Sequence, residues 1–185
     1  MAPDPARRSD RSRQAILVAA LELVESVGYA KLTIESVAAR ARVGKQTIYR
    51  WWSSKGALLF DALVELEASG RVVRPWGELG DDLKAELRAA VDELARRRFD
   101  QVCRVLVHEA RTDLVALLLA PRRVVLEQRL AAARRDGDIR ADVDVPAAAE
   151  LLLAPVYQRW LLRTGPLSGS FSDTLVDLTL RALRR

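Results

Sequence analysis

The sequence lacks the residues on which several classes of protein depend. It has one cysteine and one histidine in 185 residues, so no disulfide can close within the chain and no conventional set of zinc ligands can form. Its longest apolar run, "LVALLLA" at 114–120, is far too short to span a bilayer. The start, "MAPDPARRSDRSR", has no apolar core of a secretory signal. We therefore expect a cytoplasmic protein that has no membrane segment and binds no metal.

Motifs for catalysis are lacking as well. Cys103 and His108 are five residues apart in one predicted helix, which separates them by about 140° around its axis and rules out a nucleophile–base pair on one face. No glycine-rich phosphate loop occurs, and "DGDIRADVD" at 136–144 has no Glu to close a calcium loop. The sequence predicts neither an enzyme nor a cofactor.

The positive charge of the chain is unevenly distributed. Residues 1–56 contain ten Lys or Arg and five Asp or Glu, whereas residues 57–185 contain twenty of each. The whole excess of +5 therefore lies in the first third of the chain. Such asymmetry is typical of a polyanion-binding end attached to a neutral body, although an arginine-rich composition alone can also produce a modest excess.

Hydrophobic periodicity predicts an all-α fold, because no stretch alternates as a strand does. Pro121 and Gly137 bound one predicted helix in the expected order. "SGRVVRPWG" at 69–77 interrupts the periodicity, and the predicted boundary there divides the chain into domains at 10–68 and 69–185. After a basic arm at 1–9, helices are predicted at 10–27, 33–40, 44–51, 55–68, 78–97, 99–112, 121–136, 146–163 and 172–184.

Two of these helices, 33–40 and 44–51, are short and joined by a tight turn. This arrangement is a helix-turn-helix, predicted at about 33–52. In that motif the second helix enters the major groove of DNA. Thr33 and Ser54 are suited to cap the helices that follow them.

The outward face of the second short helix contains the predicted DNA contacts. When Ile48 and Trp52 set the inward face of a helical wheel, Gln46 and Arg50 point most directly outward. Because Gln can pair with adenine and Arg with guanine, these two are predicted to read bases. The flanking residues are predicted to contact phosphates or, for the first of them, a thymine methyl: Thr47, Lys45, Tyr49, Trp51 and Lys55.

The stretch "AILVAALELVESVGYAKLTIESVAARARVGKQTIYRWWSSKGALL", residues 15–59, resembles the amino-terminal domain of the TetR family of bacterial transcriptional regulators. The order "GY", "LTIESVA", "TIYRWW" and "SK" supports the resemblance. It implies a dimer with a three-helix amino-terminal helix-turn-helix domain, joined by a linking helix to a helical effector-binding and dimerisation domain. It also implies DNA contacts by the residues that match Thr33, Lys45, Thr47, Tyr49 and Lys55.

Two residues depart from the pattern of the family. Arg42 stands in the turn, where the family often has Gly, and Gly44 stands at the cap, where it often has Ser. A non-Gly residue at positive φ is uncommon and somewhat strained, whereas Gly caps a helix about as well as Thr does. Arg42 is added to the predicted phosphate contacts.

The part after residue 69 contains candidates for an effector site and a dimer interface. The last two predicted helices have apolar residues on more than one face, which implies a partner, and the resemblance places the dimer interface of the family in the same region. Core packing would also explain each of the residues suited to line an effector cavity: Trp76, Phe99, Cys103, Gln128 and Tyr157.

These features predict a homodimeric, ligand-responsive repressor that binds a palindromic operator in double-stranded DNA and an unknown small-molecule effector. Two alternatives stay open. One is a DNA-binding regulator of the same fold without a small-molecule effector. The other is a helical enzyme with a basic end, which the lack of a catalytic constellation disfavours.

Overall fold

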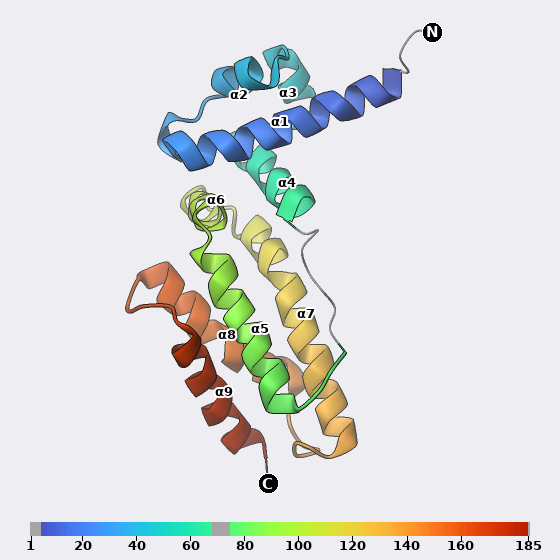
Figure 1. Ribbon diagram of the computed structural model, residues 1–185, viewed down its shortest axis with the longest axis vertical. Helices are drawn as coiled ribbons and strands as arrows, with labels where there is room; N and C mark the ends of the chain where they lie inside the picture. The colour runs from blue at the N-terminus through green and yellow to red at the C-terminus, as the bar shows by residue number, and fades with distance from the viewer. Residues whose placement is uncertain (1–4, 68–74, 185) are drawn as a thin grey trace. The chain divides into compact units, whose positions relative to one another are not determined.

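The structure is a computed structural model that describes residues 5–67 and 75–184. Every regular element in those ranges is a helix, as predicted (Figure 1), and none of these helices is long and apolar enough to cross a bilayer. The described residues form two compact units, one of 5–67 with 97–118 and the other of 75–96 with 119–184. The predicted boundary after residue 68 lies outside the described residues, and the functional division at that point stays a prediction.

The first unit is built around its longest helix, α1. Figure 1 shows α2 and α3 on one side of α1, with α4 and α6 on the other side. Side chains from several of these elements are fully buried between them, including Leu17, Leu32, Ile48, Leu58 and Leu106. Its elements are α1 (Pro5–Val27), the short 3-10 helix η1 (Tyr29–Lys31), α2 (Ile34–Ala41), α3 (Lys45–Trp51), α4 (Lys55–Glu67) and α6 (Arg97–His108).

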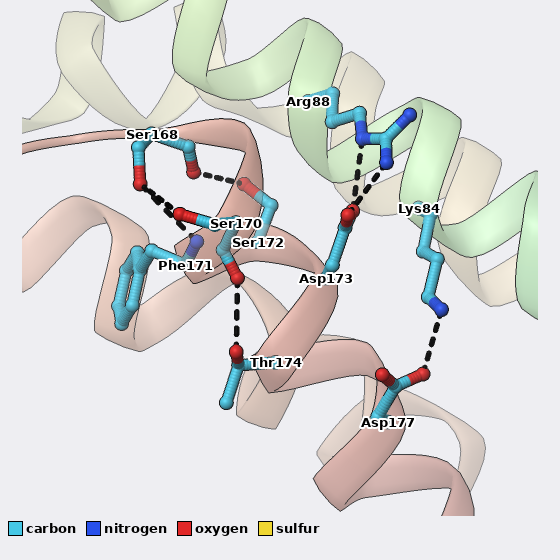
Figure 2. Close-up of polar contacts among 9 residues, drawn as sticks. All are labelled: Lys84, Arg88, Ser168, Ser170, Phe171, Ser172, Asp173, Thr174 and Asp177. Carbon is cyan, nitrogen blue, oxygen red and sulfur yellow. Dashed lines mark hydrogen bonds and ion pairs between the residues drawn. The ribbon is translucent and has the colours of Figure 1, made fainter.

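The second unit contains α5 (Leu79–Ala95), α7 (Thr112–Asp136) beyond residue 118, α8 (Val145–Leu162) and α9 (Gly169–Leu183). Ion pairs join α5 to α9 along an exposed edge (Figure 2). Arg88 donates two hydrogen bonds to the Asp173 carboxylate, at 2.8 and 2.5 Å. One turn earlier in α5 and one turn later in α9, the Lys84 ammonium lies 2.8 Å from Asp177. α5 and α9 are thus held in register by polar contacts as well as by their apolar faces.

Two buried arginines join α7 to α5 in the same unit. Arg122 donates to the carboxylates of Glu86 and Glu93, at 3.0 and 2.7 Å. Arg129, seven residues later, donates to Asp82 at 2.6 Å. A buried charge is costly unless it is paired and hydrogen-bonded. These pairs therefore specify how α7 packs on α5.

Two helices begin at least five residues earlier than predicted. α1 begins at Pro5 rather than residue 10, so part of the predicted basic arm is helical; a proline is well suited to the first position of a helix. α7 begins at Thr112, which places Pro121 inside the helix rather than at its start. Leu114, Leu118, Arg122 and Leu126 are all buried, four residues apart. Burial of this continuous face outweighs the hydrogen bond that the proline removes.

Three helices of the described chain end on a non-glycine residue in the left-handed region. Arg42 follows α2 with φ 56°, Ala110 closes α6 with φ 55°, and Arg163 follows α8 with φ 54°. The α6 end was predicted at 112, but the Arg111 N–H donates back to the Leu106 carbonyl at 2.7 Å and closes the helix early. Glycine usually marks such an end, and its absence explains the wrong bound. By contrast, the predicted ends before Gly28 and Gly137 are confirmed, with φ of 80° and 84°.

Candidate nucleic-acid interface

The interface begins with a capping box at the start of α2. Thr33 Oγ1 accepts a hydrogen bond from the Ser36 N–H at 3.0 Å, and Ser36 Oγ accepts one from the Thr33 N–H at 3.1 Å. The predicted cap is therefore confirmed, and both bonds satisfy donors that the helix leaves free. Thr33 is also exposed, so its predicted DNA contact would come from a side chain that the cap already orients.

The turn between α2 and α3 has the geometry that the sequence predicts. Arg42 adopts the left-handed conformation, with φ 56° and ψ 44°, and its side chain is exposed. Gly44 then caps α3 in an extended conformation without a side-chain hydrogen bond. Arg42 is therefore exposed in the turn between the two helices, and its phosphate contact stays a prediction.

α3 has the inward and outward faces that the helical wheel predicts. Ile48 is fully buried and Trp52 is 3% exposed. Gln46 and Arg50 are exposed, Tyr49 is exposed to 56%, and Thr47 is half-buried. Polar side chains capable of base recognition therefore project from the second helix of the motif, although their DNA contacts themselves stay predictions.

Aromatic and ionic contacts fasten the carboxy-terminal end of α3. The Trp52 indole N–H donates to the Asp61 carboxylate of α4 at 2.8 Å. Trp51 stacks on Trp52 with ring centroids 6.0 Å apart. The guanidinium of Arg13, from α1, lies 5.7 and 5.8 Å from the two rings and forms an ion pair with Glu65. α1 and α4 together hold α3 in place, and this role of Arg13 is not evident from sequence because its partners are distant along the chain.

Trp51 also supports a residue predicted to read bases. The guanidinium carbon of Arg50 lies 5.7 Å from the centroid of the Trp51 ring. A cation over an aromatic face is attracted by the ring and loses some of its conformational freedom. Trp51, with 37% exposure, can therefore orient Arg50 as well as contact the DNA backbone.

Lys55, predicted to contact a phosphate, lies in a different environment from the residues of α3. Its ammonium donates to the Leu32 carbonyl at 3.0 Å and lies 4.2 Å from the centroid of the Tyr29 ring. The Tyr29 hydroxyl donates to the Glu109 carboxylate just beyond α6. Ser54 Oγ accepts from the Ala57 N–H at 3.1 Å, so the predicted cap of α4 is confirmed. The Lys55 ammonium therefore already makes a hydrogen bond and a cation–π contact within the protein.

An acidic residue that sequence reasoning missed pairs with a predicted DNA contact. Glu35, in the first turn of α2, lies 2.7 Å from the ammonium of Lys45, the first residue of α3. The hydrogen bond from Lys45, more than its charge, lowers the pKa of the Glu35 carboxyl below its ordinary value. The same bond raises the pKa of Lys45. One sequence feature could have indicated this pair: Glu35 is the only acidic residue within 33–52.

The five predicted effector residues are divided between the two units. Phe99 and Cys103 are buried in the first unit, at 3% and 0% exposure. In the second unit, Trp76 is 49% exposed and lies over the Arg129 guanidinium at 5.7 Å, Gln128 is exposed and Tyr157 is half-buried. Their common role in an effector site stays a prediction.

Two open hollows in the described surface lie elsewhere. One, of about 460 Å³, is formed by α1 and the end of α2, and Arg11, Arg40 and Arg42 are among its lining residues. The other, of about 200 Å³, is formed by α8 and α9, where Leu151 and Leu178 are exposed. None of the five predicted effector residues lines either hollow.

Known families and solved structures are similar to this chain in sequence and in fold. Residues 16–62 match the family model for bacterial regulatory proteins of the tetR family, and residues 73–179 match the tetracyclin repressor-like, C-terminal domain. The solved TetR family transcription regulator SCO0332 is 34% identical, with a TM-score of 0.75 over 94% of this chain and 99% of its own.

Curated relatives match over nearly the full length. The chain is 33% identical over 184 residues to the DNA-binding transcriptional repressor TetR of Mycobacteroides abscessus, covering 96% of each chain. It is 26% identical over 178 residues to the HTH-type transcriptional regulator YdeS of Bacillus subtilis, covering 91% of this chain and 88% of the relative. One family model covers the helix-turn-helix, the other covers residues 73–179, and a relative 33% identical is matched over 96% of each chain, so the chain belongs to the TetR family of DNA-binding transcriptional regulators.

Proposed function

We propose that this TetR-family regulator is a ligand-responsive repressor that acts as a homodimer on a palindromic operator. The observation that carries the proposal is the outward face of α3, where Gln46 and Arg50 are exposed on a helix that Ile48 and Trp52 anchor to the core. Both side chains have the hydrogen-bonding groups that distinguish adenine and guanine in the major groove. The repressor role is supported by the name of the Mycobacteroides relative.

The homodimer is supported by apolar surface on the last two helices. Leu151 of α8 and Leu178 of α9 are exposed to 53% and 57%, and they border the hollow that Pro155 and Leu175 also line. Exposed apolar surface of this kind marks an interaction site. Two copies of this face, related by a two-fold axis, bury it against one another and pair two recognition helices.

The effector is proposed to bind among residues 60–160, in contact with some of Trp76, Phe99, Cys103, Gln128 and Tyr157. An effector that binds one conformation of the linking helix α4 better than another changes the spacing of the paired recognition helices. A hundredfold change in DNA affinity requires about 2.7 kcal/mol of differential binding. A small apolar ligand can supply that amount.

A regulator without a small-molecule effector is the second candidate. The interface between α5 and α7 favours this candidate, because two buried arginines, Arg122 and Arg129, fill it. They are paired with Glu86, Glu93 and Asp82. Opening a cavity there would require breaking buried ion pairs, which is costly. Under this candidate, regulation would depend on another protein or on the amount of the regulator.

Selection of bound duplexes from a random pool tests the DNA-binding part of the proposal. We expect a palindromic consensus whose half-sites lie about one helical turn apart, and a dimer in sedimentation velocity at micromolar concentration. Leu178→Glu should give monomers that bind the full site no better than a half-site. Leu117→Glu, at an exposed leucine of α7, is the control. A wild-type monomer that binds a lone half-site as tightly as the full site would contradict the proposal.

A thermal-shift screen followed by DNA titration tests the effector part. Ligands that raise the unfolding temperature should also change the operator affinity, and Phe99→Leu, an apolar swap chosen because Phe99 is buried, or Tyr157→Phe should alter that response while leaving ligand-free DNA binding intact. Compounds that stabilise the protein but leave operator affinity unchanged would favour the candidate without an effector.

A further inference from the structure

Within the helix-turn-helix, one carboxylate lies on the surface that faces a polyanion. Glu35 and Lys45 have side chains exposed to 58% and 54%, and their charged atoms are 2.7 Å apart. They join the first turn of α2 to the first turn of α3. Lys45 is a predicted phosphate contact, so the pair places an internal anion where a DNA phosphate would bind.

The Glu35–Lys45 pair contributes little to the stability of the fold. Exposed ion pairs contribute little to folding, since water and salt screen them, and α2 and α3 are already joined by their short turn and by burial of Val37 and Ile48. Glu35 also lies near the amino-terminal end of α2, where a negative charge is favourable. A neutral Gln there would retain most of the helix propensity and would not repel phosphates.

The pair has a direct consequence for binding to DNA. Affinity for unrelated sequences comes almost entirely from cations that replace counterions at phosphates. While the Lys45 ammonium stays on Glu35, the surface has one cation fewer for such contacts. An exposed glutamate is ionised at neutral pH, so the Glu35 carboxylate can hold the Lys45 ammonium 2.7 Å away, and the hydrogen bond from Lys45 lowers the pKa of Glu35 further.

We propose that Glu35 is a specificity-determining residue that acts through Lys45, lowering the affinity for DNA that Gln46 and Arg50 do not match. On a matched site, base contacts hold α3 in one register, and a phosphate oxygen stays within reach of the Lys45 ammonium, which exchanges Glu35 for it. On unmatched DNA the protein occupies many registers, no phosphate stays in that position, and Lys45 remains with Glu35. This inference rests on the proposed base-reading role of Gln46 and Arg50.

The experiment compares the full-length wild type with Glu35→Gln, Lys45→Gln and the double variant, each titrated with a selected operator and with an unrelated duplex over a range of salt concentrations. Glu35→Gln should raise affinity for the unrelated duplex about three- to tenfold and steepen its salt dependence by about 0.9, the slope of one added phosphate contact. Operator affinity should rise less, with an unchanged slope, so the specificity ratio falls. In the Lys45→Gln background these effects of Glu35→Gln should disappear.

Glu25→Gln is the matched control. It makes the same chemical change and also removes one ion-pair partner of an arginine, because Glu25 lies 2.6 Å from Arg98 outside the helix-turn-helix. It should leave both affinities and both slopes unchanged. Thermal unfolding of every variant separates any helix-stabilising effect of Glu35 from its effect on DNA, since a purely structural role would not change the salt slope of the unrelated duplex.

Three outcomes would overturn the inference. The first is an affinity of Glu35→Gln for the unrelated duplex equal to that of the wild type and of Glu25→Gln. The second is a gain that persists in the Lys45→Gln background, and the third is a shift of the selected base at one position, which would mean that Glu35 contacts a base directly. Failure of the proposed function is separate: the wild type would then select no sequence from the pool.

Discussion

The ammonium of Lys55 lies 4.2 Å from the centroid of the Tyr29 ring and donates to the Leu32 carbonyl at 3.0 Å. The first residue of α4 is thereby tied to the segment that precedes α2, and the Tyr29 hydroxyl extends the connection to Glu109 after α6. A residue expected to bind DNA therefore also joins three parts of one unit.

Lys55→Ala should have two separate effects. Loss of the hydrogen bond and of the cation–π contact should lower the free energy of unfolding by about 1–3 kcal/mol, measured by urea denaturation. If Lys55 also contacts a phosphate, binding to all sequences should weaken and the salt slope should fall by about 0.9. Lys31→Ala, at an exposed position of η1, removes the same charge as a control. Lower stability with an unchanged slope would show that Lys55 has only a structural role.

Arg42→Gly should change stability and DNA affinity in opposite directions. Gly adopts the φ of 56° found at this turn more easily than Arg does, so the variant should gain about 0.5–1 kcal/mol of unfolding free energy. It should lose affinity for all DNA sequences alike if the guanidinium contacts a phosphate. Parallel denaturation and DNA titrations measure the two effects. Unchanged DNA affinity at low salt would show that Arg42 does not contact DNA.

Trp52→Phe should destabilise the first unit more than Trp51→Phe does. Trp52 is 3% exposed and its indole N–H donates to Asp61; Phe leaves both a gap and an acceptor without that donor, which should cost about 1–3 kcal/mol. Trp51 is 37% exposed, so its replacement should cost about 1 kcal/mol or less. Urea denaturation followed by circular dichroism compares them. Equal losses would mean that the bond to Asp61 contributes nothing.

Base-reading and backbone-contacting residues should be separable by mutation. Gln46→Ala and Arg50→Ala should each cost about 1–3 kcal/mol on the preferred site and relax the preference at one base position. Tyr49→Phe should weaken binding to all sequences about equally. Repeating the selection with each variant provides the measurement. A new consensus from Tyr49→Phe, with the original consensus retained by Arg50→Ala, would reverse these roles.

Asp173→Asn should make the stability of the second unit less dependent on pH. The hydrogen bonds from Arg88, followed by the charges of Arg88 and Lys84, lower the pKa of Asp173 below its ordinary value of 3.8 (Figure 2). A carboxyl with a lowered pKa stabilises the fold above its unfolded-state pKa, and this contribution is lost as pH falls through the folded-state pKa. The variant should therefore be less stable at pH 7, by no more than about 1 kcal/mol for so exposed a pair.

Denaturation of Asp173→Asn and wild type at several pH values between 7 and about 2 measures this difference. The two proteins should become equally stable at the acid end of the series. A difference that stays constant over the whole range would assign the effect to packing rather than to ionisation of Asp173.

Local chemistry along the chain determined much of the first unit. The helical period, the Thr33 and Ser54 caps and the glycine at 28 are properties of neighbouring residues, and the structure confirms each of them. The outward face of α3 follows from the same local geometry, since a helix repeats every 3.6 residues whatever packs against it. Sequence alone was therefore sufficient to predict the helix-turn-helix and the direction of its side chains.

Tertiary structure decided what depends on residues far apart in the chain. α7 continues through Pro121 because burial of one face outweighs a local preference, and α6 closes at Ala110 without the glycine that would have marked its end. The partners of Lys55, of Lys45 and of the buried Arg122 were equally absent from any local pattern. Each was settled only when packing brought distant groups together, because the strength of an electrostatic contact depends on the distance and the burial of its atoms and not on their separation in sequence.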